Sequence, residues 1–457
     1  MADAVVIDLG QDWSIADNDR PARPGLTRRL LVTLVAVAAV LLVGGAEPVR
    51  PAFVALAEIP IDLAPVIVLS PGRVFVADRA DSVVAGRTWH GVVAAHALPG
   101  GVVRWRTRIP EVPRELWLAP GARVVLAATH DNGPGAAQTM ALDAGTGRLL
   151  WSSTSTHVAH AAAGSTQGLL FDHSASGEMV VRGADLRTGQ TIWSRAVPEG
   201  GGVRLIHGAA LSDPVRVLLT TPDGAVELLA EQTGAMLAAG RLGGLHPPSD
   251  QPGDTVPEGA NMAQRMPAQV TVVGGRVLVV RPQGASTAML AAFDLATFTP
   301  QWTVTGDFYG YPDVCGPMVC LAGVDALTAV DPATGAVAWR AGRWQIGEMI
   351  DRDHLLAVAH QPGMSMGLLD ARTGRVLMQM SGWTPVYDTA AARIRLAVRP
   401  DTRQYGRFWF ATLDPRYRAP SLLGYLPRVV SRDCQTAGDL LACHTLRRTV
   451  QIWRYRT

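Results

Sequence analysis

A hairpin motif that recurs along the chain constrains its fold more than any other feature. In the clearest copy, residues 329–339, an apolar strand runs into Asp331, turns through Thr334 and Gly335, and leaves as a second strand that reaches Trp339. The Asp carboxylate accepts backbone N–H bonds inside such a turn, and Gly takes a positive φ without steric cost. One such hairpin cannot bury its apolar face alone. The motif therefore predicts neighbouring copies that cover one another.

Further copies share the same frame of Asp, Thr, Gly and Trp. The clear copies are framed by Asp143, Gly147 and Trp151; by Asp185, Gly189 and Trp193; by Asp294 and Trp302, with Phe298 where Gly is expected; by Asp331, Gly335 and Trp339; and by Asp370 and Gly374, with Met378 where Trp is expected. Weaker copies end at Trp105, Ala238 and Leu422. Successive copies lie roughly 40 to 60 residues apart, the period of propellers and arrays.

A short apolar run precedes each copy, as in Val124–Ala127 and Leu355–Val358. These runs have the length of strands and are rich in β-branched and large apolar residues. Each repeat therefore contains about four short strands, the composition of a propeller blade.

The pattern Ala-x-Asp-x-x-Thr-Gly-x-x-x-Trp resembles the repeat of the pyrroloquinoline-quinone-type (PQQ-like) β-propeller superfamily, over about residues 60–457. That superfamily includes quinoprotein dehydrogenases and the non-enzymatic scaffold of the outer-membrane β-barrel assembly machinery. The resemblance implies an all-β propeller. Within the superfamily, the chain resembles the scaffold branch more than the dehydrogenases. It says little about function, because the motif joins blades together.

The number of blades follows from the inner apolar strands. Nine candidates lie near Val74, Val124, Leu169, Val217, Val277, Met318, Leu355, Ile394 and Leu440. Because relatives in this superfamily favour seven or eight blades, we predict eight four-stranded blades, within a range of seven to nine. The last repeat ends near Trp453 without an outermost strand. An N-terminal segment such as Phe53–Leu56 or Val66–Leu69 is expected to complete it, since an open edge invites aggregation.

The N-terminal region predicts a membrane anchor. Residues 1–29 are polar and end in Arg28 and Arg29, and the uncharged apolar run 30–46 follows. This run is near the short limit for a spanning helix, and the positive-inside rule places residues 1–29 in the cytoplasm. The predicted organisation is a cytoplasmic tail (1–29), a transmembrane helix (30–46), a tether (47–60) and an extracytoplasmic propeller (61–457). A cleaved signal peptide and a buried core helix are the alternatives.

Charge and loops bear on the partners. The net charge is +2, which gives no argument for nucleic acid. Loop 242–268 has the composition of an exposed irregular segment, with disorder as the alternative. Aromatic residues gather in 306–314, and two Trp follow later repeats, so the candidate contact residues are Phe308, Tyr309, Tyr311, Trp344 and Trp383. Packing between blades is the alternative role for these side chains.

The four cysteines form two local pairs, Cys315 with Cys320 and Cys434 with Cys443. In each pair the first Cys ends one strand and the second lies in the next strand of the hairpin. Antiparallel neighbours hold Cβ atoms near disulfide geometry, and an exported location agrees with bridges. We predict both disulfides. Zinc is the alternative, although neither spacing is that of a zinc knuckle.

No catalytic constellation is found. The sequence has no nucleophile elbow, no His-Glu-x-x-His and no phosphate-binding Gly loop. Quinoprotein dehydrogenases of the superfamily carry a vicinal Cys–Cys pair, and this chain has none. We therefore predict no cofactor and no metal site. The expected function is a membrane-anchored scaffold of the bacterial cell envelope that binds a protein, peptide or envelope polymer. The alternatives are an exported quinoprotein-type oxidoreductase or other propeller enzyme, and a sensor.

Overall fold

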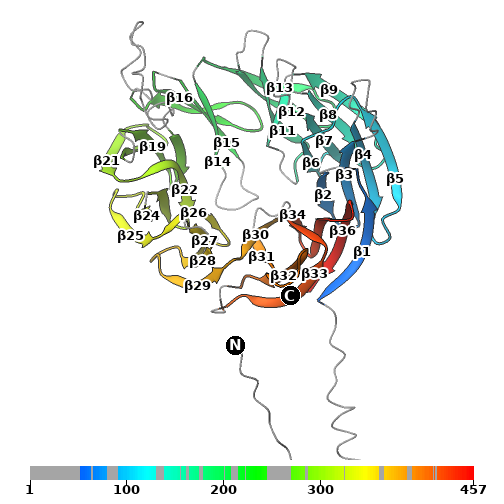
Figure 1. Cartoon of the computed structure of the whole chain (residues 1–457). Helices are drawn as coiled ribbons and strands as arrows, with labels where there is room; N and C mark the ends of the chain where they lie inside the picture. Colours follow the sequence, from blue (N-terminus) through cyan, green and yellow to red (C-terminus); the bar gives the residue numbers. More distant parts are fainter. Residues whose placement is uncertain are drawn as a thin grey trace, which may run out of the picture. The chain divides into compact units, whose positions relative to one another are not determined.

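A computed structural model gives the fold of the chain (Figure 1). It describes residues 52–62, 65–79, 91–129, 138–154, 156–160, 164–173, 179–199, 201–206, 215–221, 223–243, 269–283, 287–323, 325–359, 365–388, 394–414, 416 and 419–456. Of the two compact units, 1–51 and 52–457, the described residues all belong to the second.

The described residues form antiparallel four-stranded blades, in which strands that are adjacent in sequence pair with one another. Blades 1 to 4 are β2 (Val66–Ser70), β3 (Arg73–Arg79), β4 (Gly91–Ala97) and β5 (Val103–Ile109); β6 (Glu115–Ala119), β7 (Val124–Thr129), β8 (Gln138–Asp143) and β9 (Leu149–Thr154); β10 (Thr156–His160), β11 (Gln167–His173), β12 (Met179–Asp185) and β13 (Thr191–Val197); and β14 (Gly202–Ile206), β15 (Arg216–Thr220), β16 (Ala225–Ala230) and β17 (Met236–Arg241).

The remaining blades continue the same order. Blades 5 to 9 are β18 (Gln269–Val273), β19 (Arg276–Pro282), β20 (Ala288–Asp294) and β21 (Pro300–Gly306); β22 (Tyr309–Cys315), β23 (Met318–Ala322), β24 (Ala326–Val330) and β25 (Val337–Gly342); β26 (Trp344–Met349), β27 (His354–Ala359), β28 (Ser365–Asp370) and β29 (Val376–Ser381); β30 (Thr384–Asp388), β31 (Ile394–Pro400), β32 (Arg407–Thr412) and β33 (Ser421–Pro427); and β34 (Val429–Ala437), β35 (Leu440–Thr445), β36 (Thr449–Tyr455) and β1 (Phe53–Pro60).

The hydrophobic core lies between blades. Among the described residues, nine clusters of buried apolar side chains occupy the nine junctions between successive blades. The cluster that contains Ile59, Val74 and Ile452 joins blade 9 to blade 1. The ring is therefore closed, and every blade buries both of its faces against neighbours, as the hairpin motif predicts.

The N-terminal strand completes the last blade. β1 pairs with β36 in antiparallel register, with Phe53 opposite Tyr455 and Pro60 opposite Thr449. The expected closure by Phe53–Leu56 is confirmed. Figure 1 shows this strand, in blue, beside the red C-terminal strand. Blades 8 and 9 also join through a short parallel pairing of β30 with β34, so they form one eight-stranded sheet.

The predicted blade number was one too low. The described strands form nine blades, the upper limit of the expected range, and each of the nine inner apolar runs belongs to a blade of its own. The preference of relatives for seven or eight blades misled the count. The physical signal, one apolar inner run per blade, was sufficient.

The ring has two faces that the backbone defines. On the hairpin face lie the turns between the first and second strands and between the third and fourth strands of each blade. Hydrogen bonds between these turns show that they adjoin, as in Ala144 N to Arg123 O and Ala371 N to Asp353 O. On the loop face lie all other connections, joined by bonds such as Leu242 N to Gly224 O.

The predicted transmembrane helix, residues 30–46, and its flanking tail lie outside the described residues. The part of the chain that the structure describes contains no helix that is long and apolar enough to span a bilayer.

Candidate functional site

The motif Trp residues fasten each blade to the next one. In five blades the indole N–H donates to the carbonyl oxygen of the residue directly after the Asp position of the next motif turn, and the ring covers the Gly of that turn. The sets are Trp105 with Ala144 O (3.1 Å) and Gly147; Trp151 with Leu186 O (2.9 Å) and Gly189; Trp193 with Glu231 O (2.6 Å) and Gly234; Trp302 with Pro332 O (3.1 Å) and Gly335; and Trp339 with Ala371 O (3.0 Å) and Gly374.

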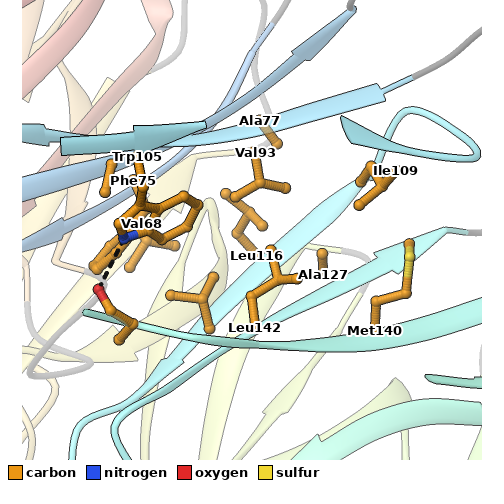
Figure 2. Packing of buried hydrophobic residues seen from close by; sticks show 13 residues of the cluster. Val68, Phe75, Ala77, Val93, Trp105, Ile109, Leu116, Ala127, Met140 and Leu142 are labelled. Carbon is orange, nitrogen blue, oxygen red and sulfur yellow. Dashed lines mark hydrogen bonds between the residues drawn. The ribbon is translucent and has the colours of Figure 1, made fainter. Parts of the chain in front are cut away.

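Figure 2 shows this arrangement at the junction of blades 1 and 2. The Trp105 ring lies against Phe75 with 5.9 Å between ring centroids, and the dashed line marks its bond to Ala144. A Cβ at Gly147, whose φ is 73°, would collide with the Trp105 ring. The Gly of the motif therefore serves two needs at once, a left-handed turn and room for the indole.

The residue beneath each Trp is small. Across the strand pair, the five Trp face Ala95, Ala141, Gly183, Ala292 and Ala329. Where the Trp is missing, at Ala238 and Met378, the facing residues are Leu228 and Leu368. The facing residue is larger where the Trp is missing, because the interior stays closely packed and a leucine fills part of the volume that the indole ring would occupy.

The junction of blades 4 and 5 uses the opposite arrangement. Blade 4 has Ala238 at the Trp position, and blade 5 has Phe298 at the Gly position. Phe298 adopts a φ of 54°, is buried, and its ring lies where a Cβ of Gly240 would be. Here the aromatic ring comes from the turn and the glycine comes from the preceding blade. The junction therefore still packs one aromatic ring against one glycine.

At the junction of blades 8 and 9 the N-terminal strand supplies the ring. Gly424, and not Leu422 as the sequence spacing indicated, stands at the Trp position of β33. The Phe53 ring is its nearest neighbour, with Cε2 at 3.8 Å from an ideal Cβ of Gly424. Phe53 also packs edge to face on Phe410 with 5.7 Å between centroids. β1 therefore both adds a strand and replaces a missing motif aromatic.

The motif Asp residues organise the turns. Asp294 Oδ1 accepts the backbone N–H groups of Ala296 (3.0 Å) and Thr297 (2.9 Å) and the Thr297 hydroxyl (3.0 Å). The Thr297 backbone and hydroxyl bonds hold the pKa of Asp294 below its usual value. At Asp143 burial raises the pKa, but the bonds from Thr146, Gly145 and Arg187 outweigh it and the net shift is downward. These carboxylates are structural anions that satisfy turn donors.

One motif Asp also links two blades. Asp143 Oδ2 accepts a bond from Arg187 Nη2 at 3.1 Å, and Arg187 Nη1 lies 3.3 Å from Ala122 O. Arg187 belongs to the motif turn of blade 3, and both acceptors belong to blade 2. Asp185, Asp331 and Asp370 occupy the same turn position in their own blades, with backbone N–H donors at 2.6 to 2.9 Å.

Both cysteine pairs are joined. Cys315–Cys320 links β22 to β23 in blade 6, and Cys434–Cys443 links β34 to β35 in blade 9. All four residues are buried, and they belong to the clusters between blades. Each bridge therefore ties the first hairpin of its blade.

The structure gives a packing role to three of the five candidate contact residues. Phe308, Trp344 and Trp383 are only 4, 3 and 6 % exposed. Phe308 and Trp344 lie against Gly306 and Gly367, and each of the three belongs to a cluster between blades. Large aromatic rings fill such junctions well. Tyr309 and Tyr311 lie in β22, and their side chains fall outside the described residues.

Loop 242–268 starts from a fixed point on the loop face. Leu242 is fully buried, and its backbone N–H donates to Gly224 O at 2.8 Å. Arg281 Nη2 donates to Leu242 O at 2.9 Å and Gly243 O at 3.0 Å. Burial lowers the pKa of Arg281, although the side chain stays charged. The rest of the loop, from residue 244, lies outside the described residues.

Within the described ranges no group of three or more His, Cys, Asp or Glu side chains is placed to hold a metal ion. The motif Asp residues each serve their own turn and do not converge.

These features define a class: closed nine-bladed propellers whose blades are fastened by a docked Trp and an Asp turn. The sequence model of the family described as outer membrane protein assembly factor BamB matches residues 61–221 and 222–400, so the chain belongs to that family. This membership supports a protein-interaction scaffold as the general kind of function.

Three solved structures are similar to the chain, and the first of them shares its fold. A eukaryotic initiation factor is 12 % identical, with 79 % of this chain and 91 % of that chain covered and a TM-score of 0.52. BamB from Moraxella catarrhalis is 16 % identical over 88 % of this chain and all of that chain, with a TM-score of 0.45. A quinohemoprotein alcohol dehydrogenase from Pseudomonas putida is 11 % identical over 68 % and 72 %, with a TM-score of 0.35. No curated protein matches the sequence.

Proposed function

We propose that this chain is a membrane-anchored scaffold of the bacterial cell envelope that binds a protein, a peptide or an envelope polymer and catalyses no reaction. The Asp, Gly and Trp residues that the repeats share form the turns and the contacts that hold the blades together. Membership of the BamB family supports a binding role. The apolar run 30–46 supports the anchor, and the two disulfides support an oxidising compartment outside the cytoplasm.

The loop face is the proposed binding face, and one observation carries this assignment. The longest connection between described strands, 242–268, leaves from the loop face, where Arg281 fixes its first residues. The connections 80–90 and 130–137 leave from the same face, because each joins the second and third strands of a blade. Long loops on a rigid scaffold commonly carry binding residues.

In-cell photo-crosslinking tests the binding face. A photoreactive amino acid placed at Asp250 or Tyr311 of the full-length chain should capture the same partner. The matched control positions, Thr188 and Thr373, are exposed turn residues on the hairpin face. Capture of one partner from both Asp250 and Tyr311, and from neither control, supports the proposal. Capture from the controls alone contradicts it.

Topology has a separate test. Thr373→Cys should react with a membrane-impermeant maleimide in intact spheroplasts, because its turn would lie outside the cytoplasm. Ser14→Cys should react only after the membrane is opened, because residues 1–29 would lie inside. The reverse pattern would overturn the anchor orientation.

A further inference from the structure

The exposed apolar surface of the ring is concentrated on one rim. Among the described residues, ten of the fifteen exposed large hydrophobic side chains lie at or next to the start of a fourth strand. Blades 1 to 4 and 6 to 8 place there Val103, Leu149, Ile192, Met236, Val337, Val376 and Leu422. Fourth strands start on the hairpin face, so these side chains form a rim on that face.

The chain enters the ring at the same rim. The Arg456 backbone N–H donates to Ala52 O at 3.0 Å, and Tyr455 N donates to Asp439 O, which lies in a hairpin-face turn. Only residues 47–52 separate the apolar run 30–46 from β1, and six residues span at most about 20 Å when fully extended. If a membrane holds residues 30–46, as proposed, the short tether keeps the start of β1 close to that membrane.

Three neighbouring blades meet around this point. On one side Leu422 is the second residue of β33, and Gly424 of the same strand faces Phe53. On the other side Val102 and Val103 follow Gly101. Gly101 packs against β1, because an ideal Cβ built on Gly101 would lie 3.2 Å from the Cβ of Ala57. Val54 lies between them. Figure 1 shows β33, β1 and β5 in this order along the ring.

Arginines flank this arc of aliphatic side chains. Arg104 follows Val103, and Arg456 follows the end of β36. Both are exposed, and among the described residues neither takes part in an ion pair. Exposed aliphatic residues beside arginine suit the interface of a phospholipid bilayer, where alkyl groups enter the acyl boundary and guanidinium groups bind phosphates.

We propose that the arc formed by Leu422, Val54, Val102 and Val103, with Arg104 and Arg456, docks onto the phospholipid surface of the membrane that holds residues 30–46. This inference rests on the proposed anchor. The anchor makes a weak contact sufficient, because a short tether turns docking into an intramolecular event at high effective concentration. The loop face then points away from the lipid, toward partners.

Depth-dependent fluorescence on the full-length chain in liposomes tests the arc. The structure joins all four native cysteines in disulfides, so a single introduced cysteine accepts an environment-sensitive dye. The arc positions are Val103→Cys and Leu422→Cys. The controls are Leu237→Cys and Met236→Cys of blade 4, which match them in exposure at 52 and 56 % but lie on the far side of the ring.

Nitroxide-labelled phospholipid should reduce dye emission about twofold at both arc positions and leave both controls unchanged, because docked side chains reach the acyl boundary. Flotation of the liposomes separates the two proposals. If the chain floats with the liposomes and no position is quenched, the arc is wrong and the anchor stands. If all four positions are quenched equally, the ring lies flat and the arc is also wrong. If the chain does not float, the anchor itself is wrong.

Discussion

At the scale of single residues, a pair formed by one indole and one glycine repeats around the ring. The indole needs a gap without a side chain, and the turn needs a residue that accepts a positive φ, so one glycine satisfies both. Two of the four junctions without the motif Trp keep the principle with other residues. Phe298 with Gly240 and Phe53 with Gly424 each place one aromatic ring against one glycine.

A double-mutant cycle measures this pairing. Trp105→Ala should destabilise the ring by about 3–5 kcal/mol, because the indole is buried at a blade junction. Gly147→Ala should also destabilise it, through φ strain and collision with the ring. Once Trp105 is absent the collision vanishes, so the double variant should be more stable than additivity predicts, by about 1–3 kcal/mol.

The control for Gly147→Ala is Gly72→Ala. Gly72 has a φ of 75°, against 73° for Gly147, and nothing lies within 4 Å of its ideal Cβ. It therefore reports φ strain alone. Urea unfolding of the wild type and the four variants gives the free energies. Equal losses for the two glycine variants, or strict additivity in the cycle, would show that the indole does not rest on Gly147.

The turn carboxylates predict a pH dependence. The folded pKa of Asp294 lies below its ordinary value of 3.8. The stabilisation from this carboxylate is therefore complete above about pH 4 and is lost as the pH falls through the folded pKa. Asp294→Asn should lower the urea midpoint at pH 7, and the difference from the wild type should shrink toward pH 3. A difference that stays constant or grows at low pH would contradict the role of the charge.

Many of the contacts made by single residues could be predicted from the sequence. The turn of Asp, Thr and Gly and the Trp that covers a neighbouring layer follow from local chemistry, and the described blades contain both features. The partner of Phe298 could not be predicted, because Gly240 belongs to the outer strand of another blade. Trp344 and Trp383 were candidate contact residues, yet the structure buries them. A sequence shows an aromatic residue but not the depth at which it lies.

At the scale of elements, the strand that enters from the N-terminus decides whether the ring closes. β1 completes blade 9, carries Phe53 into the junction with blade 8, and places Ile59 in the junction with blade 1. Sequence reasoning found this closure because the last repeat lacked a strand. It undercounted the blades because the preference of relatives outweighed nine independent apolar runs.

Truncation tests the contribution of β1. A chain that starts at residue 52 should unfold in one cooperative transition, because every described strand is retained. A chain that starts at residue 61 should lose the β36 partner and two junctions. Hydrogen exchange should then show faster exchange in β36 and β35, with increased aggregation from the open edge. Similar exchange in the two chains would mean that β1 is dispensable.

The disulfides make a modest prediction. Each closes a short loop, with sequence separations of 5 and 9 residues, so loop entropy gives about 2–3 kcal/mol at most for each. Replacing one pair with alanines should lower the free energy of unfolding by this order, and the ring should still form. Mass spectrometry of the unreduced wild type should find no free thiol. Four free thiols in material from the cell envelope would contradict the bridges and the proposed compartment.

At the scale of the whole molecule, nine blades pack against one another in a closed ring. We assign membrane docking to the hairpin face and partner binding to the loop face. The hairpin face is occupied by blade-fastening turns and by the point where the chain enters. The loop face carries the longest connection. The fold could be predicted from the repeat, but the division between faces could not. It depends on which turns adjoin, and the sequence does not show this.

Closure of the ring is tested most directly by a register-specific cross-link between its two ends. Val54 and Arg454 are cross-strand partners in β1 and β36, and both are exposed. Val54→Cys with Arg454→Cys should form a disulfide under mild oxidation, and mass spectrometry should recover the linked peptide. Val54→Cys with Gln451→Cys is three positions out of register and should not link. Linkage in the second pair, or in neither pair, would contradict a ring closed by β1.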